Sequence, residues 1–248
     1  MIKKAIRILL NRLGYSVHRL RQVDENMLGH RDPIADQAAL LHGITEPCIM
    51  DAGAYIGEIS LAYQRFFPRA RIIALEPFPN TFSTLCEKTK GRNIECLELA
   101  LSGKSGKSSL QIYNHRPANS LLQPHPERAA TWGKEVLDKV SQVNIETRTL
   151  EDLFLMLGLE HLDVLKLDVQ GMEYEILNAA MPMLKQGKVN LIYLEIIIMP
   201  TYQNQHTISE YLHLLYEAGF ELFNIYNLSS VNGQLRQVDA LFKFKLND

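Results

Sequence analysis

The residues best suited to chemistry stand where an apolar run ends in an acid and two glycines, Asp51-Ala-Gly53-Ala-Tyr-Ile-Gly57. This order of residue types is typical of a strand, a glycine turn and the start of a helix. Gly53 lets a ligand approach the backbone where a side chain would clash, and Gly57 permits a tight entry into the helix. Asp51 can either accept hydrogen bonds from an ammonium group or support the loop. The segment is therefore a candidate ligand site.

The composition of this loop argues against a dinucleotide as the ligand. A dinucleotide site favours G-x-G-x-x-G, because the pyrophosphate then sits on the helix N-terminus. Here Tyr55 stands in the place of the second glycine, and an acid precedes the turn. An anionic pyrophosphate is disfavoured, and a cofactor with a cationic amino-acid end fits better.

A second acid follows the next apolar run, where Glu76 precedes Pro77-Phe78-Pro79. An acid at the tip of the second strand of a β-α-β unit is where a ribose diol is held by hydrogen bonds. Either signal alone is weak, but the two at this spacing predict an S-adenosylmethionine site. The alternative is a tight turn and a surface acid.

A third candidate lies in residues 165–177, LKLDVQGMEYEIL, where Asp168 ends an apolar run and Gly171 precedes a helical pattern. An acid at the carboxyl tip of a central strand faces the crevice in which α/β sheets bind ligands. Asp168 can also be the N-cap of the following helix. The two roles are compatible.

These motifs need an alternating fold to bring them together. Short apolar runs predict strands at 48–53, 71–76, 94–100, 163–168, 190–195, 220–226 and 240–246. Helices are predicted near 57–67, 80–90, 172–184 and 208–218. Continuous apolar strands are typical of a parallel sheet covered on both faces, and the alternation favours a doubly wound α/β fold.

Three regions depart from that simple pattern. Residues 103–148 hold strand candidates at 108–113 and 143–149 around a proline-marked loop, so we expect a β-hairpin and loop excursion after strand three. In the last strand, apolar residues alternate with lysines, which predicts an antiparallel strand near the sheet edge. Asp32 and Pro33 mark the start of a helix ahead of the sheet.

The charge is unevenly distributed along the 248 residues. Residues 1–22 carry six basic side chains and no acid, and the remaining chain has 20 basic against 28 acidic side chains. We therefore expect no nucleic-acid partner. Residues 1–31 are interpreted as a basic amphipathic helix and linker, and 32–248 as one domain. The helix either packs on that domain or lies on an anionic membrane surface.

Compartment signals are few. No apolar run reaches the roughly 18–20 residues that span a bilayer, and the N-terminus lacks a convincing signal peptide. The three cysteines are odd in number and far apart, which favours a reducing compartment. We expect a cytoplasmic protein with possible contact to the inner membrane surface. Its oligomeric state cannot be read from the sequence.

Five blocks then carry a specific resemblance: DAGAYIG, ALEPFPNTF, ALSGKSG, TLEDL and LKLDVQGMEYEIL. From about Asp32 to Leu194 the chain resembles the FkbM-type methyltransferase family. The resemblance implies a seven-stranded Rossmann-like sheet and S-adenosylmethionine as methyl donor. It also implies O-methylation, with hydroxyls of sugars, glycolipids, polysaccharides or natural products as typical acceptors.

The resemblance also implies roles for single residues. The cofactor-binding residues would be Asp51, Gly53, Ala54, Tyr55, Gly57, Glu76, Pro77, Phe78, Ala100 and Leu101. Of these, the glycine loop would surround the methionine end, Glu76 the ribose, and Ala100 with Leu101 the adenine. Asp168 would lie near the transferred methyl group. Gln170 stands where the family often has Glu, so we predict no metal.

Methyl transfer to a hydroxyl requires alignment of the reacting atoms and removal of the hydroxyl proton. The candidate bases are Asp168, Glu195 and a histidine of the excursion, His115 or His125; Ser120 can hydrogen-bond an acceptor. Two other classes stay open. An N-methyltransferase on a macromolecule would want Asn/Asp-Pro-Pro-aromatic where Asp168-Val-Gln-Gly stands. The other class is a non-catalytic module that binds the cofactor, and the neutral Gln170 supports it.

Overall fold

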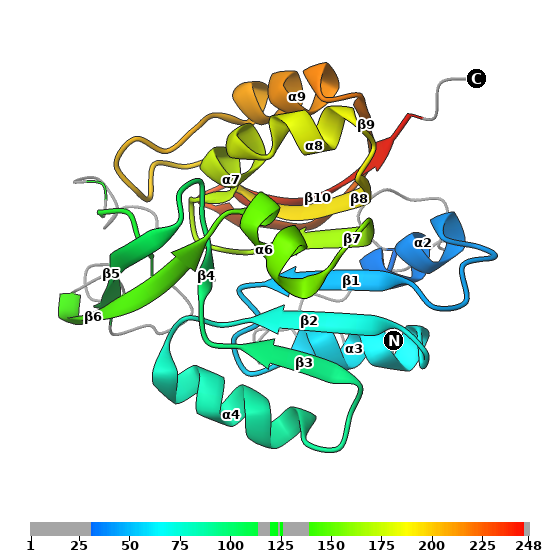
Figure 1. Ribbon diagram of the computed structural model, residues 1–248. Coiled ribbons are helices and arrows are strands. Elements are labelled where there is room, and N and C mark those ends of the chain that lie inside the picture. The colour runs from blue at the N-terminus through cyan, green and yellow to red at the C-terminus, as the bar shows by residue number, and fades with distance from the viewer. Residues whose placement is uncertain (1–30, 114–119, 124, 126–138, 246–248) are drawn as a thin grey trace, which may run out of the picture.

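The computed structural model describes residues 31–113, 120–123, 125 and 139–245 (Figure 1). Its main sheet has the strand order β3-β2-β1-β7-β8-β10-β9. Strand β10 runs antiparallel to both of its neighbours, β8 and β9, and the other neighbouring strands pair in parallel. The strands are β1 (Cys48–Ala52), β2 (Arg71–Leu75), β3 (Ile94–Leu97), β7 (Leu162–Leu167), β8 (Val189–Ile197), β9 (Phe220–Val231) and β10 (Gln234–Phe244). The predicted Rossmann-like sheet, with one antiparallel strand next to the edge, is confirmed.

Helices cover both faces of the sheet (Figure 1). They are α2 (Pro33–Leu40), α3 (Glu58–Phe66), α4 (Pro79–Thr89), α6 (Leu150–Leu157), α7 (Glu173–Ala179), α8 (Met181–Lys185) and α9 (Ile208–Glu217). The first three pack on one face, where Tyr63 and Leu85 are fully buried. The last four pack on the other, where Leu153 and Leu215 are fully buried. The core therefore lies in two layers, and the ends of the strands stay available for a site.

The excursion after β3 forms a second, smaller sheet. It consists of β4 (Ala100–Leu101), β5 (Gly106–Tyr113) and β6 (Lys139–Arg148), with β6 in the centre, parallel to β4 and antiparallel to β5. Figure 1 shows it projecting beyond the end of the main sheet at which β1, β2 and β3 finish. The predicted hairpin is therefore present, next to the carboxyl ends of the central strands.

Two predicted elements are each divided in the structure. The strand predicted at 94–100 ends at Leu97, because a tight turn in which the Leu99 N–H donates to the Leu97 carbonyl sends the chain into the small sheet. The helix predicted at 172–184 breaks at Ala180 between α7 and α8. Pro182 explains the break, because it lacks the N–H that a continuous helix needs.

Two further features were missed in the sequence. Helix α6 was not predicted, although the Thr149 hydroxyl caps it by accepting the Asp152 N–H, a local signal that the sequence contained. Strands β9 and β10 are longer than predicted, and Asn232-Gly233 joins them with both residues at positive φ. Asn-Gly is a strong signal for such a two-residue hairpin turn.

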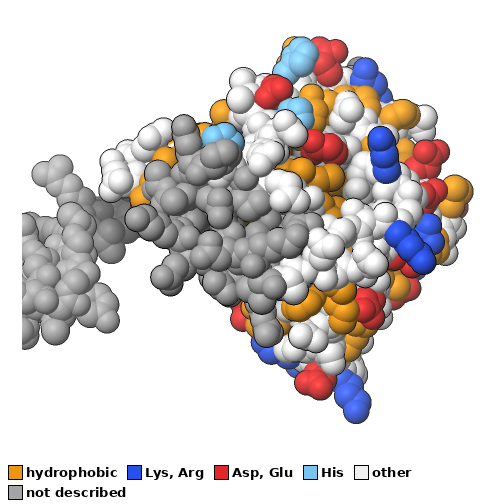
Figure 2. Space-filling model, turned by 90° about the vertical axis from the view of Figure 1, so that its left-hand side faces the viewer, with side chains coloured by type: hydrophobic (Ala, Val, Ile, Leu, Met, Phe, Trp, Pro, Cys, Tyr) orange, Lys and Arg blue, Asp and Glu red, His pale blue; other side chains and the backbone are white. Residues whose placement is uncertain are grey.

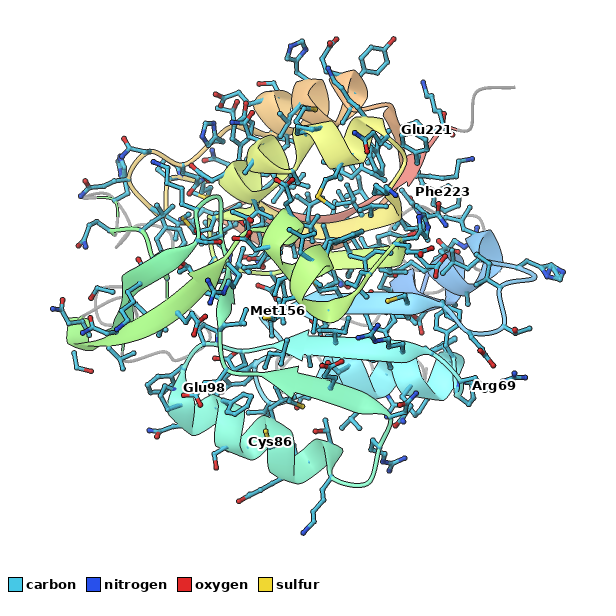
Figure 3. All side chains as sticks on the ribbon, viewed as in Figure 1. Arg69, Cys86, Glu98, Met156, Glu221 and Phe223 are labelled. Atoms are coloured by element: carbon cyan, nitrogen blue, oxygen red, sulfur yellow. The ribbon has the colours of Figure 1, made fainter. Side chains whose placement is uncertain are left out.

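The far end of the sheet carries ordinary surface residues. In the view of Figure 3, Arg69, Glu221 and Phe223 lie near the end of the sheet away from the small sheet. Glu221 pairs there with Lys243 at 3.1 Å. In the described part of the chain, no helix is long and apolar enough to cross a bilayer. The basic segment 1–22 lies outside the described residues.

Candidate active site

The glycine loop after β1 is shaped by its contact with the end of β7. Gly53 has a φ of +75°, and a Cβ built there would fall 1.9 Å from the Asp168 carbonyl oxygen. The Asp168 N–H in turn donates to the Ala52 carbonyl at 3.1 Å. Gly53 is therefore required by the close approach of the chain's own backbone. Gly57, with a φ of +86°, begins α3 as predicted.

Asp51 lies behind this loop, and its side chain is fully buried. One carboxylate oxygen accepts from the Ser60 hydroxyl at 2.6 Å, and the other lies 2.9 Å from the Lys166 Nζ. Lys166 also donates to the Gly53 carbonyl at 3.0 Å. Of the two roles that the sequence left open for Asp51, this geometry favours support of the loop, because the ammonium group it binds belongs to Lys166.

Lys166 was missed in the sequence, although a lysine between Leu165 and Leu167 in an otherwise largely apolar run was a signal. Burial by itself lowers the pKa of this ammonium group, but Asp51 and Asp168 outweigh burial and raise the pKa above its ordinary value. Lys166 is therefore a permanent cation that ties the β1 loop to the end of β7, 3.8 Å from Asp168.

Glu76 forms a second buried anchor at the end of β2. Its carboxylate accepts from the Tyr55 N–H and the Phe78 N–H, both at 3.0 Å, and from the Thr81 hydroxyl at 2.7 Å. Burial raises the pKa of Glu76, while these donors and Lys166 act in the opposite direction. Tyr55 has a φ of +52°, a conformation uncommon outside glycine, and its N–H is aimed at Glu76. Glu76 thus connects the loops after β1 and β2.

The other residues predicted to bind the cofactor, including Ala100 and Leu101 at the adenine, separate into two groups. Phe78 and Ala100 meet in one apolar cluster beside the small sheet, and Pro77 is half-buried next to them. Leu101 and Ala54 instead turn their side chains into other buried clusters. Any contact that these two make with a cofactor would have to come from their backbone.

Beyond β7 the site continues as a network of side chains. The Gln170 Nε2 donates to Asp168 Oδ1 at 2.9 Å and to Glu195 Oε2 at 3.1 Å. Gln237 donates to the other oxygen of Glu195 at 2.5 Å. The Asp168 side chain is 41% exposed, whereas burial, followed by Asp168, Glu173 and Asp239, raises the pKa of Glu195 well above its usual range. Two of the predicted bases thus meet, and Asp168 is the accessible one.

The described part of the excursion contacts the segment that follows β8. The His125 N–H donates to the Thr201 carbonyl at 2.8 Å. Nearby, the buried Ser120 hydroxyl donates to the Gln170 carbonyl at 2.6 Å, which gives it a structural role. Tyr202, which was missed in the sequence, donates its hydroxyl to the Gln170 Oε1 at 3.1 Å. His115 lies outside the described residues.

A pocket of about 640 Å³ opens between the small sheet and α7. Its lining combines hydroxyl, amide and charged groups with a few apolar side chains: Ser102, Gly103, Lys104, Ser105, Lys107, Ser108, Leu121, Leu122, Thr147, Met172, Glu175, Asn178 and Ala179. Figure 2 views this side of the molecule, where histidine and acidic side chains gather near one margin. Among the described residues, no group of three or more His, Cys, Asp and Glu side chains is arranged to hold a metal.

Comparison with known proteins places this site in a family. The chain is 32% identical over 155 residues to the methyltransferase sdnD of Sordaria araneosa, a match that covers 54% of this chain and 60% of that protein. It is 26% identical over 187 residues to the 2-O-methyltransferase NoeI of Sinorhizobium fredii, covering 71% and 73%. The match thus spans less than two thirds of sdnD.

Among solved structures, the chain is similar to the magnesium protoporphyrin IX methyltransferase ChlM from Synechocystis, whose structure was solved with bound S-adenosylmethionine. The two are 13% identical with a TM-score of 0.49, and the match covers 98% of this chain and 97% of that one. A model of the methyltransferase FkbM domain matches residues 51–222. Because that match covers well over half of the sequence, the chain belongs to the FkbM methyltransferase family.

Proposed function

We propose that this protein transfers the methyl group of S-adenosylmethionine to a hydroxyl of a sugar, glycolipid, polysaccharide or natural product. The observation that carries the proposal is the convergence, at one end of the sheet, of the Glu76 anchor with the exposed carboxylate of Asp168. The first suits a cofactor, and the second suits an acceptor whose proton must be removed. Membership of the FkbM family supports the same reaction.

The residues present fit the polar parts of S-adenosylmethionine. Glu76 uses three of the roughly four acceptor positions of a carboxylate, which leaves one for a ribose hydroxyl. Phe78 and Ala100 offer an apolar surface to the adenine. The glycine loop, held from behind by Asp51 and Lys166, would surround the methionine end. When bound, the cofactor supplies an electrophilic methyl group on a sulfonium.

Asp168 is the residue that we assign to the acceptor's proton. It is the most exposed carboxylate of the network, and Lys166 lies 3.8 Å from one of its oxygens. Its other oxygen is held by Gln170. A carboxylate fixed in this way can accept a proton from a hydroxyl placed within hydrogen-bond reach. Glu195 is the reserve candidate, but both of its oxygens already accept hydrogen bonds, from Gln170 and from Gln237.

The acceptor class rests on two observations. NoeI, a relative that aligns over 71% of this chain, is a 2-O-methyltransferase. The pocket beside the loop that carries Met172 has a lining rich in hydroxyl and amide groups, which suits a polyhydroxylated acceptor. The acidic balance of the domain disfavours RNA or DNA as the acceptor.

The proposal is tested by incubation with methyl-labelled S-adenosylmethionine and a panel of glycans, lipid-linked sugars and RNA. Label should appear in a hydroxylated small molecule or glycan, and Asp168→Asn should abolish most of it. Glu221→Gln, at the far end of the sheet, is the matched control and should leave transfer intact. Transfer to RNA alone, or cofactor binding with no transfer to any acceptor, would overturn the proposal.

A further inference from the structure

A single side-chain amide spans the two carboxylates of the acceptor side. The two hydrogens of the Gln170 Nε2 point to different partners, Asp168 Oδ1 at 2.9 Å and Glu195 Oε2 at 3.1 Å. Asp168 lies at the end of β7 and Glu195 lies on β8, so the amide connects neighbouring strands. A neutral group therefore satisfies two acids at once, without adding a charge.

The orientation of this amide is fixed by a contact on its oxygen and by a contact on the Gln170 backbone. The Tyr202 hydroxyl donates to its oxygen at 3.1 Å, which identifies the nitrogen as the atom that faces the carboxylates. Tyr202 is almost fully buried, so its hydroxyl has little freedom. The Gln170 backbone has a φ of +56°, and its carbonyl accepts from the Ser120 hydroxyl at 2.6 Å. A non-glycine residue in this conformation needs such support from its surroundings.

The electrostatic surroundings make a neutral bridge significant. The charged and titratable groups around it are Asp51 on β1, Lys166 and Asp168 on β7, Glu173 on α7, Tyr193 and Glu195 on β8, Tyr202 after β8, Tyr211 on α9 and Asp239 on β10. Lys166 is the one cation in this group, and it is engaged with Asp51 and the Gly53 carbonyl. Another acid at position 170 would bring a third carboxylate next to Asp168 and Glu195.

We propose that Gln170 is a positioning residue that cross-links Asp168 to Glu195 and holds the Asp168 carboxylate in place for the acceptor's proton. The amide takes no proton itself, since it acts only as a donor to both carboxylates. Tyr202 acts one step further out, because it fixes which end of the amide faces them. The inference rests on the proposed function, in which Asp168 is the base.

The first test compares Gln170→Glu with Gln170→Ala and Tyr202→Phe by the pH dependence of methyl transfer. Gln170→Glu replaces both donors with a third carboxylate, so the acid limb of the pH–rate profile should move to higher pH by about one unit or more. Gln170→Ala should lower kcat by about 10- to 100-fold through misplacement of Asp168, with little change in cofactor KM. Tyr202→Phe should give a smaller loss of kcat.

Gln186→Glu is the matched control, since it makes the same chemical change at an exposed residue at the end of α8. Its profile should match that of the wild-type protein. The proposal would be overturned if the acid limb of the pH–rate profile stayed unchanged in Gln170→Glu. It would also be overturned if Gln170→Ala lost cofactor binding and kept its kcat.

A second readout does not depend on turnover. Carbon NMR of protein labelled at the glutamate carboxyl groups follows the titration of Glu195. The Glu195 resonance is identified by its absence in Glu195→Gln. Its midpoint should rise in Gln170→Glu and stay unchanged in Gln186→Glu; an equal midpoint in all three proteins would disprove the bridge. If the wild-type protein transfers no methyl group, the proposed function fails, while this titration still tests the contact between Gln170 and Glu195.

Discussion

On the β1–β2 side of the site, buried carboxylates are held by hydroxyl and backbone N–H groups close to them in the sequence. Glu76 is bound by donors from residues 2, 5 and 21 positions away. On the β7–β8 side, Asp168 is held by Gln170 two positions away, but Glu195 is held by side chains from other strands and loops. Gln170 reaches Glu195 and Tyr202 across 25 and 32 positions, and Gln237 reaches Glu195 across 42.

The difference separates two tasks. Local contacts build a rigid anchor that does not depend on the acceptor, which suits a cofactor shared by a whole family. The contacts around Glu195 come from other strands and loops, so a change there need not disturb that anchor. Lys166 is the exception that connects the two sides, because its ammonium group contacts Asp51 and Gly53 and lies near Asp168. Substitutions on the two sides should therefore have separable effects.

The largest effect is expected at Asp168. Asp168→Asn removes the proposed base but keeps the size of the side chain, so kcat should fall by about 10²- to 10⁴-fold. Cofactor affinity, measured by calorimetry with S-adenosylhomocysteine, should change little. A loss of affinity comparable to the loss of kcat would instead assign Asp168 to the cofactor side.

The connection between the two sides is tested at Lys166. Lys166→Met leaves Asp51 buried without its cation, and removal of one partner of a buried pair costs about 3–5 kcal/mol of unfolding free energy. Chemical denaturation measures the loss. The double variant Lys166→Met/Asp51→Asn removes the buried charge as well and should recover part of the stability. A double variant no more stable than Lys166→Met would contradict this account of the pair.

A pH dependence follows from Glu173, which accepts the Val169 and Gly171 N–H groups at the start of α7. Burial raises its pKa from 4.5 to about 7, so the folded protein binds a proton that the unfolded chain releases between these values. Protonation of Glu173 therefore contributes about 3 kcal/mol to the free energy of unfolding. This contribution is fully present below pH 4.5 and is lost as the pH rises to 7 and above.

Glu173→Gln should flatten this part of the stability profile, as measured by denaturation at a series of pH values. Glu217→Gln, an exposed change at the end of α9, is the control and should retain the slope. The same slope in Glu173→Gln as in the wild-type protein would exclude Glu173 as its source.

The smallest effect is expected at the cofactor anchor. Glu76→Ala should weaken binding of S-adenosylmethionine by about 1.5–3 kcal/mol, or roughly 10- to 150-fold, the range for hydrogen bonds to a charged group. Calorimetry measures the change, and Glu221→Ala at the far end of the sheet serves as the control. Unchanged affinity in Glu76→Ala would remove Glu76 from the ribose.

The same contrast explains what could be predicted from the sequence. The glycine loop, Glu76 and the strand pattern are local signals, so the fold class and the meeting of the β1 and β2 loops at one end of the sheet followed from them. The contacts of Gln170 with Tyr202 and of Lys166 with Gly53 depend on how distant strands come together, which no local pattern specifies. The division of the strand at 94–100 likewise depends on pairing with β6.

Single-turnover methyl transfer at saturating S-adenosylmethionine tests the central claim, that Glu76 serves the cofactor and Asp168 the acceptor. Saturation compensates for weakened binding but not for a missing base. Glu76→Ala should therefore react at close to the wild-type rate, and Asp168→Asn should be slower by about 10²- to 10⁴-fold. A near-normal rate for Asp168→Asn would contradict the account and shift the base to Glu195 or His125.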